Sequence, residues 1–212
     1  MNILVVHNRY TNRGGEDLVF ENEVALLKDM GHNVVTYERT NEEIDELNFF
    51  KRMCLPLTMF FSLRSYFEVK ELLLKCKIDV MHVHNTLIMV SPSAYYAAFG
   101  LRIPVIQTIH NFRLLCPNGL LMRQGKICEE CIAGSVYNAV KHKCYRNSRV
   151  QSFLVASMIA VHRRIGTYNK LNYICLSAFN KKKILELNCK SGVLISSEQI
   201  FIKPNFYNDG IV

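Results

Sequence analysis

The hydrophobic positions of the chain predict an alternation of buried strands and amphipathic helices. Residues 3–7 form an apolar run that ends in histidine, and apolar residues then recur with helical spacing from Leu18 to Leu27. A continuous run suits a parallel strand covered on both faces, and the helical period supplies the covering helix. Similar patterns predict strands at residues 34–37, 79–83, 105–109, 173–176 and 200–202, and helices at residues 62–77, 94–98, 149–164 and 178–187.

This order of elements predicts an α/β domain. Alternating strands and helices of this length favour a Rossmann-like, doubly wound and mostly parallel sheet with right-handed crossovers. No internal repeat or Gly/Ser-rich linker divides the 212 residues, which are enough for one substantial core. We therefore expect a single domain over residues 1–212, with a cysteine-rich loop insertion at residues 116–144.

Two glycines follow the first predicted strand. Gly14 and Gly15 carry no side-chain bulk, so backbone N–H groups and the following helix N-terminus can approach a phosphate or a sugar hydroxyl. The dinucleotide motif G-x-G-x-x-G is absent. Because ligands of parallel sheets bind at the carboxyl ends of strands, the pattern predicts a ligand crevice there, with a purely structural turn as the alternative.

The net charge and the apolar stretches of the chain limit its possible partners and location. Lys and Arg number 26 against 18 Asp and Glu, and the net charge of +8 favours an anionic neighbour such as a nucleotide, a phospholipid surface or nucleic acid. The N-terminus has no signal-peptide pattern, and the apolar stretch at residues 153–161 is too short to span a bilayer. We therefore expect a cytoplasmic protein.

Half of the eight cysteines lie in the loop insertion. Their spacing is C-x11-C-x2-C-x12-C, and the members are Cys116, Cys128, Cys131 and Cys144. A C-x2-C pair presents two thiolates from one turn, so the pattern predicts a structural zinc ion, for which His142 can replace Cys144. Free buried thiols and redox chemistry are the alternatives. The other four cysteines are expected to be small core residues, namely Cys54, Cys76, Cys175 and Cys189.

Three histidines lie near predicted strand ends. His82 and His84 fall on one face because side chains alternate along a strand. With no carboxylate nearby in the sequence, we favour structural hydrogen bonding or lining of an acceptor cleft over metal ligation. His110 ends an apolar strand at the predicted crevice, where it is either a site residue or a core histidine bonded to a backbone carbonyl.

Two segments combine aromatic and basic residues, as membrane-surface segments do. They lie at residues 49–53 and 60–64, and Pro56 is expected to prevent one continuous helix through both. We expect these segments to pack against the sheet, and peripheral membrane contact is the alternative. A second basic group lies at residues 141–149 and can face phospholipid; nucleic acid is the less favoured partner.

Four motifs occur in one order at predicted strand ends. They are Gly14-Gly15-Glu16, Asp79-Val80-Met81-His82-Val83-His84-Asn85, Pro104-Val105-Ile106-Gln107-Thr108-Ile109-His110-Asn111 and Lys203-Pro204-Asn205. With these motifs the chain resembles the N-terminal half of a family-four glycosyltransferase, a retaining enzyme with the GT-B fold. The resemblance implies two facing Rossmann-like domains, of which the N-terminal one holds mainly the acceptor and the other mainly the nucleotide-sugar donor.

The resemblance also implies roles for individual residues. His110 matches the active-site histidine, which contacts the donor sugar and helps to stabilise charge in the transition state. The implied substrate-binding residues are Gly14, Gly15, Glu16, His84, Asn85 and Asn111. A glycan or lipid-linked acceptor, a place at the inner face of the membrane and no catalytic metal are implied as well.

We therefore expect the acceptor-side domain of a glycosyltransferase, inactive without its donor-binding domain. One alternative is a split transferase whose donor domain is a separate polypeptide. Another is a non-enzymatic, zinc-stabilised module that binds nucleic acid or protein.

Overall fold

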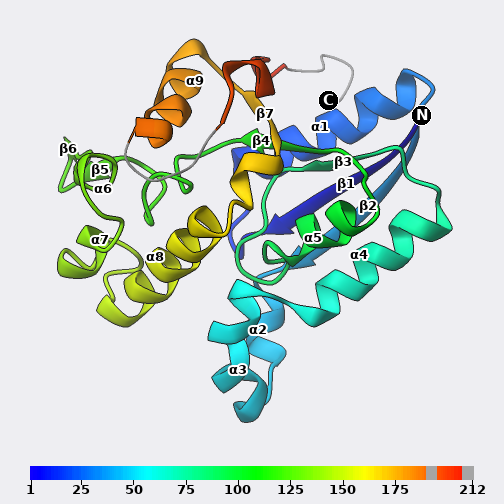
Figure 1. Cartoon of the computed structure of the whole chain (residues 1–212). Helices are drawn as coiled ribbons and strands as arrows, with labels where there is room; N and C mark the ends of the chain where they lie inside the picture. Colours follow the sequence, from blue (N-terminus) through cyan, green and yellow to red (C-terminus); the bar gives the residue numbers. More distant parts are fainter. Residues whose placement is uncertain (190–194, 207–212) are drawn as a thin grey trace. The chain divides into compact units, whose positions relative to one another are not determined.

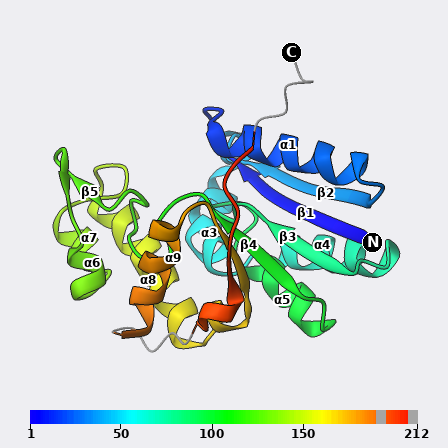
Figure 2. The same ribbon diagram turned by 90° about the horizontal axis from the view of Figure 1, so that it is seen from above.

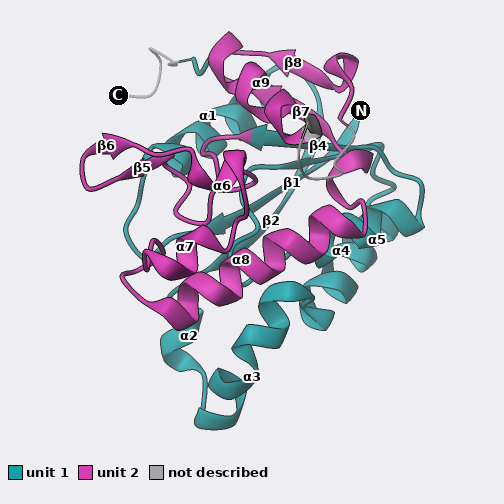
Figure 3. Cartoon of the chain, turned by 60° about the vertical axis from the view of Figure 1, so that its left-hand side comes forward, with its two compact units in different colours: residues 1–108, 204–212 teal, residues 109–203 magenta. Residues whose placement is uncertain are grey.

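The computed structural model describes residues 1–189 and 195–206, except for the side chains of residues 188 and 189. The described chain divides into two compact units (Figure 3). Unit 1 contains residues 1–108 and the segment that begins at Pro204, and unit 2 contains residues 109–203. Each unit is described by itself below, and the assignment of residues 1–212 to one domain stays a prediction.

Unit 1 is built on parallel strands in the order β2-β1-β3-β4. The strands are β1 (Asn2–Arg9), β2 (Asn33–Thr40), β3 (Val80–Val83) and β4 (Val105–Ile109), whose last residue begins unit 2. In β1, Ile3 pairs with Val34 on one side and with Val80 on the other. Because β1 is central, its apolar run is buried, as the sequence predicts.

The helices of unit 1 cover both faces of these strands. They are α1 (Gly15–Asp29), α2 (Glu43–Glu46), α3 (Phe49–Phe60), α4 (Leu63–Lys75) and α5 (Ser93–Gly100). Figure 2 shows α1 over one face of β1 to β3, and α4 and α5 over the other. Phe20 of α1 packs with Ile3 and Val5 in the layer beneath the helix. The expected α/β, Rossmann-like class is confirmed.

Helix α3 corrects two expectations. As expected, no single helix runs through residues 49–53 and 60–64, but Pro56 is not the cause, because it lies inside α3. Proline has a helical φ and costs the helix only one hydrogen bond. The break falls at Phe61 and Ser62, where the Ser62 side chain caps α4. The large apolar side chains along α3 were expected to pack on the sheet, but four are 64–76% exposed: Phe49, Phe50, Met53 and Leu57. No helix in the described part of the chain is long and apolar enough to cross a bilayer.

Unit 2 contains one strand pair, a hairpin and several helices. Strands β7 (Asn172–Cys175) and β8 (Ile200–Ile202) are parallel, and β5 (Met122–Arg123) pairs antiparallel with β6 (Lys126–Ile127). The α-helices are α6 (Glu130–Ala133), α7 (Asn138–Lys141), α8 (Arg149–Arg164) and α9 (Ala178–Leu185) (Figure 1). Short 3-10 helices lie at Tyr168–Lys170, Glu186–Cys189 and Ser197–Gln199.

The four cysteines outside the loop insertion differ in their surroundings. Cys175 of β7 is buried, which confirms its expected core position. Cys76 is half-buried at the end of α4, whereas Cys54 is exposed on α3 and its expected core position is wrong, because α3 turns that side chain to solvent. The side chain of Cys189 lies outside the described residues.

Candidate functional site

The carboxyl ends of β1 and β3 meet at one edge of unit 1. Here the side-chain amide of Asn85 donates to the backbone oxygen of Asn8 at 2.8 Å and to Oε1 of Glu16 at 3.1 Å. The Asn85 side-chain oxygen accepts from the backbone N–H of Leu87 at 3.1 Å. The structure thus brings together two of the residues implied to bind substrate, Glu16 and Asn85, although 69 positions separate them.

The two glycines form the entrance to α1. Gly14 is the N-cap residue, with an extended backbone (φ −125°, ψ 178°), and α1 begins at Gly15. A Cβ added at Gly15 would meet no atom within 4 Å, and one added at Gly14 would lie 4.0 Å from the Asp17 carboxylate. Neither packing nor backbone strain within this unit therefore requires glycine, and the open space leaves room for a ligand at the helix N-terminus.

A buried hydrogen bond between a neutral imidazole and a carboxylate anchors this N-terminus to β1. Oδ1 of Asp17 lies 2.8 Å from Nε2 of His7, and Oδ2 accepts from the backbone N–H of Gly14 at 2.7 Å. Burial raises the pKa of the Asp17 carboxyl, but the hydrogen bonds from Gly14 and His7 outweigh it, so this pKa is lowered. Burial is the larger influence on His7 and lowers its pKa despite the carboxylate. Asp17 is therefore ionised at neutral pH.

His84 lies under α1 rather than at the edge. Its side chain is fully buried, its Nε2 lies 3.2 Å from Oε2 of Glu23, and the Phe20 ring packs edge-on against it with centroids 5.5 Å apart. This burial does not fit lining of an acceptor cleft. The expectation that no carboxylate lies near the two histidines was also wrong, because Glu23 comes from α1, far away in the sequence. Its helical spacing from Phe20 and Leu27 was the available signal.

His110 and Asn111 follow Ile109, the first residue of unit 2. His110 is half-buried directly after β4. The side-chain oxygen of Asn111 accepts from the backbone N–H of Arg113 at 3.0 Å, which forms a tight turn. The substrate roles implied for both residues stay predictions.

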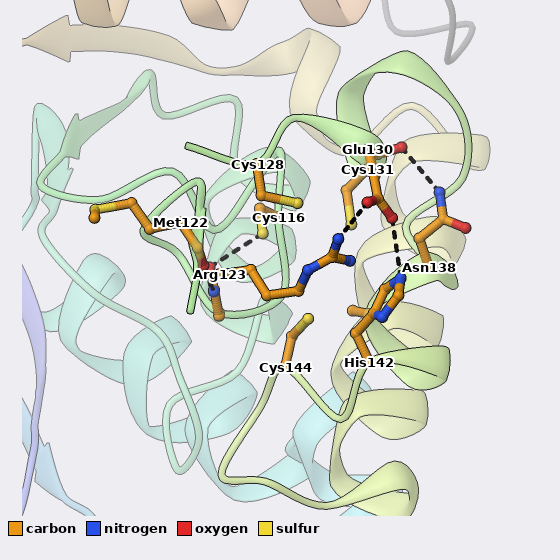
Figure 4. Close-up of a pocket in the computed structure, with 11 residues that line it drawn as sticks. Cys116, Met122, Arg123, Cys128, Glu130, Cys131, Asn138, His142 and Cys144 are labelled. Atoms are coloured by element: carbon orange, nitrogen blue, oxygen red, sulfur yellow. Dashed lines mark hydrogen bonds and ion pairs between the residues drawn. The ribbon is translucent and has the colours of Figure 1, made fainter. Parts of the chain in front are cut away.

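The four loop cysteines gather around one cavity in unit 2 (Figure 4). They come from the turn after β4, the end of the β5–β6 hairpin, α6 and the segment after α7. Short elements position them; the backbone N–H of Cys128, for example, donates to the oxygen of Leu121 at 2.9 Å. The side chains that line the cavity with them include Met122, Arg123, Glu130, Asn138 and His142.

Charged groups lie beside these thiols. Glu130 binds Nη2 of Arg123 at 2.6 Å and Nε2 of His142 at 3.0 Å. A hydrogen bond from Cys131 lowers the pKa of the Cys116 thiol, whereas burial raises the pKa of Cys144. Four thiols and an imidazole suit zinc. Within the described residues, however, no three of these sulfurs lie within 4.8 Å of one another, so an ion would have to draw them closer.

A sequence model for the description "Glycosyltransferase Family 4" matches residues 13–187 of this chain. The chain belongs to Glycosyltransferase Family 4. The match includes the glycine turn, the end of β3, His110 and the whole cysteine loop, whereas the motif Lys203-Pro204-Asn205 lies outside the matched residues. No curated protein matches the chain.

Solved structures support the fold assignment. The chain is similar to a UDP-GlcNAc 2-epimerase from Neisseria meningitidis bound to UDP-GlcNAc, with a TM-score of 0.54 and 14% sequence identity. The similarity covers 97% of this family member and 46% of the epimerase chain, so the family member spans about half the length of that structure. At this identity the likeness shows the fold alone. A second similar structure is the S. aureus MnaA-UDP co-structure, with a TM-score of 0.35 and 13% sequence identity. The similarity covers 95% of this family member and 68% of the MnaA chain, and at this TM-score it carries no argument.

Proposed function

We propose that this family member is the acceptor-side domain of a glycosyltransferase that moves a sugar from a nucleotide sugar to a glycan or lipid-linked acceptor. The contact between Glu16 and Asn85 beside the open N-terminus of α1 carries the proposal. Ligands of parallel sheets bind at this position, and family membership supplies the class of reaction. A second, donor-binding domain completes the proposed enzyme.

Each group in the proposed mechanism has a separate role. The positive end of the α1 dipole and the first-turn N–H groups face an anionic or hydroxyl-bearing ligand over Gly15; the N–H of Gly14 is already bound by Asp17. The Glu16 carboxylate accepts from sugar hydroxyls while Asn85 holds it in place. His110 belongs to unit 2, and its separate role follows from the family resemblance alone: it stabilises the negative charge that grows as the bond between sugar and nucleotide breaks. No step of this scheme uses a catalytic metal.

Glu16→Gln tests this assignment in the chain joined to a donor-binding domain. The amide keeps the size of the side chain but loses its charge, so we expect kcat/KM for the acceptor to fall about tenfold, or ~1.4 kcal/mol, with the KM of the donor unchanged. Glu21→Gln is the matched control, since Glu21 lies on the same helix and is 36% exposed. Equal kinetics of Glu16→Gln and Glu21→Gln would contradict the proposed site.

We further propose a structural zinc ion in the cysteine loop and peripheral contact with the inner face of a membrane through α3. Thiols from four separate short segments around one cavity support the zinc ion. The exposed apolar side chains of α3, together with Lys51 and Arg52 on the same helix, support the membrane contact. A lipid-linked acceptor would be reached from such a surface.

A further inference from the structure

Three buried side chains with metal-ligating atoms meet beneath α1 in unit 1. They are Glu23 from α1 and His82 and His84 from β3 and its carboxyl end. Their ligand atoms all lie within 4.8 Å of one another. Oε2 of Glu23 is 3.2 Å from Nε2 of His84 and 4.0 Å from Nε2 of His82, and all three side chains are at most 8% exposed.

Strand pairing and helix packing hold the three side chains in place. His82 and His84 share a face because side chains alternate along the strand, and the pairing of His82 with Val5 holds that face in register with β1. Phe20 packs with Ile3 and Val5 and so sets the position of α1, which brings Glu23 over the histidines. The rings of His82 and His84 lie 4.5 Å apart by their centroids. The three groups are therefore held by the core and not by flexible loops.

Their chemistry matches one class of ligand. Two imidazoles and one carboxylate suit zinc and neighbouring first-row transition metals, whereas calcium and magnesium prefer oxygen ligands throughout. Two ligands on one tetrahedral zinc ion lie about 3.3 Å apart when each bond is about 2.0 Å. The 3.2 Å between Glu23 and His84 already has this spacing, and a small shift of His82 closes the set.

We propose that Glu23, His82 and His84 bind one divalent transition-metal ion, with zinc as the leading candidate. The ion joins α1 to β3 and so stabilises the helix whose N-terminus carries the glycine pair. Binding replaces the hydrogen bond between His82 and the Thr108 hydroxyl, which is 2.7 Å long. This site is separate from the cysteine loop in its residues and ligand atoms, and it does not depend on the proposed glycosyl transfer.

Cobalt(II) is the probe that separates the two sites. Thiolate ligation gives intense charge-transfer absorption, which a site of two imidazoles and a carboxylate lacks. We would therefore titrate the full, reduced, metal-free chain carrying Cys128→Ser and Cys131→Ser, which leaves the loop only two of its four thiols. The expected result is about one cobalt ion bound per chain with d–d bands and no thiolate band. Failure of this folded variant to bind cobalt would overturn the proposal.

Single substitutions in the same background locate the ion. Glu23→Gln and His82→Gln should each weaken cobalt binding at least about tenfold. Two matched controls should leave it unchanged: Glu21→Gln on the same helix, and His162→Gln, which removes a buried histidine of unit 2. Added zinc should also raise the Tm of the chain carrying Cys128→Ser and Cys131→Ser, because an ion that binds only the folded state stabilises it. Unchanged affinity in both ligand variants, or a zinc effect on Tm that survives them, would place the ion elsewhere.

Discussion

At the scale of single residues, Asn8 organises the edge where the candidate site lies. Its side-chain oxygen accepts from the backbone N–H groups of Met89 and Val90 at 2.7 and 3.1 Å, and its amide donates to Asn41 at 3.0 Å. Buried backbone donors are costly without partners, so one asparagine holds the segment after β3 against the end of β1. Asn85 belongs to that segment, and its contact with Glu16 depends on this support.

His110 is the residue whose replacement should affect chemistry most. In the chain joined to a donor-binding domain, His110→Ala should lower kcat by about a hundredfold, equivalent to ~3 kcal/mol of transition-state stabilisation, with little change in Tm. The physical reason is the loss of a group that stabilises the departing nucleotide. Initial rates and thermal melts measured on the same preparations test this.

The control for His110→Ala is His162→Ala, which removes a buried histidine of unit 2 bonded to Thr167 at 2.9 Å. It should lower the Tm and leave turnover per folded molecule intact. If His110→Ala shows this second pattern instead, His110 is a core residue and not part of the site.

At the scale of elements, the cysteine loop contains only short helices and strands. Its strands β5 and β6 have two residues each, and α6 and α7 have four each. Helices and hairpins this short are unstable by themselves. A zinc ion bound by the four cysteines is therefore expected to add to the order that buried side chains such as Leu121, Val136 and Ala139 supply.

Removing one thiol should release the loop ion. Cys131→Ser should lower the zinc content by about one ion per chain and make the loop sensitive to proteases, since structural zinc contributes on the order of 10 kcal/mol to its module. Elemental analysis after purification under reducing conditions measures this. Cys76→Ser, a half-buried thiol outside the loop, should retain the wild-type content. Equal zinc in both variants would remove the cysteines from the ligand set.

A second element-scale prediction concerns the connection between β2 and α2. Glu43 accepts from Nε of Arg39 at 2.7 Å and from Nη2 at 2.6 Å, and Arg39 is 7% exposed. Burial raises the pKa of the Glu43 carboxyl, but the hydrogen bonds from Arg39 and the Thr40 N–H outweigh it, so this pKa lies below 4.5. The ionised carboxylate therefore stabilises the fold above pH 4.5, and this stability is lost as the pH falls through the lower folded pKa.

Glu43→Gln should consequently lower the free energy of unfolding by about 2 kcal/mol at pH 7 and by less in acid. Urea unfolding of both forms at pH 7 and near pH 4 measures the difference. The exposed neighbour Glu42 supplies the control Glu42→Gln, for which we expect almost no effect. An equal loss at both pH values would show that the charge of Glu43 contributes nothing.

At the scale of the whole molecule, the chain spans 46% of the epimerase structure to which it is similar. In the proposed enzyme, the donor phosphates are held and water is excluded between two domains, which one of them cannot do alone. Residues 1–212 by themselves should therefore transfer no sugar, while weak binding of an acceptor persists.

A transfer assay on purified residues 1–212 with a panel of nucleotide sugars measures this. The same chain joined to a donor-binding domain is the positive control. Robust transfer by residues 1–212 alone would contradict the acceptor-side proposal. If neither form transfers sugar and the zinc-loaded chain binds protein or nucleic acid, the non-enzymatic module becomes the better explanation.

The sequence by itself determined the elements and their order. The strand at residues 105–109 and the helix at residues 149–164 have the predicted bounds, and Ser148 and Ser177 cap their helices by accepting from Gln151 and Asn180. These features depend on residues a few positions apart, so hydrophobic period and capping chemistry are sufficient to predict them. The family resemblance came from the same local motifs.

Only the tertiary structure decided which distant side chains meet and which faces stay exposed. Glu23 reaches His84 because α1 packs on β1 through Phe20, and α3 presents its apolar side chains to solvent although their pattern also suits a buried helix. The periodicity of apolar residues along a helix or strand does not tell which other element packs against its apolar face. The packing partner of a face is set by elements more than 50 residues apart in the sequence. Their packing decides whether a histidine lines a cleft or lies beside a buried carboxylate.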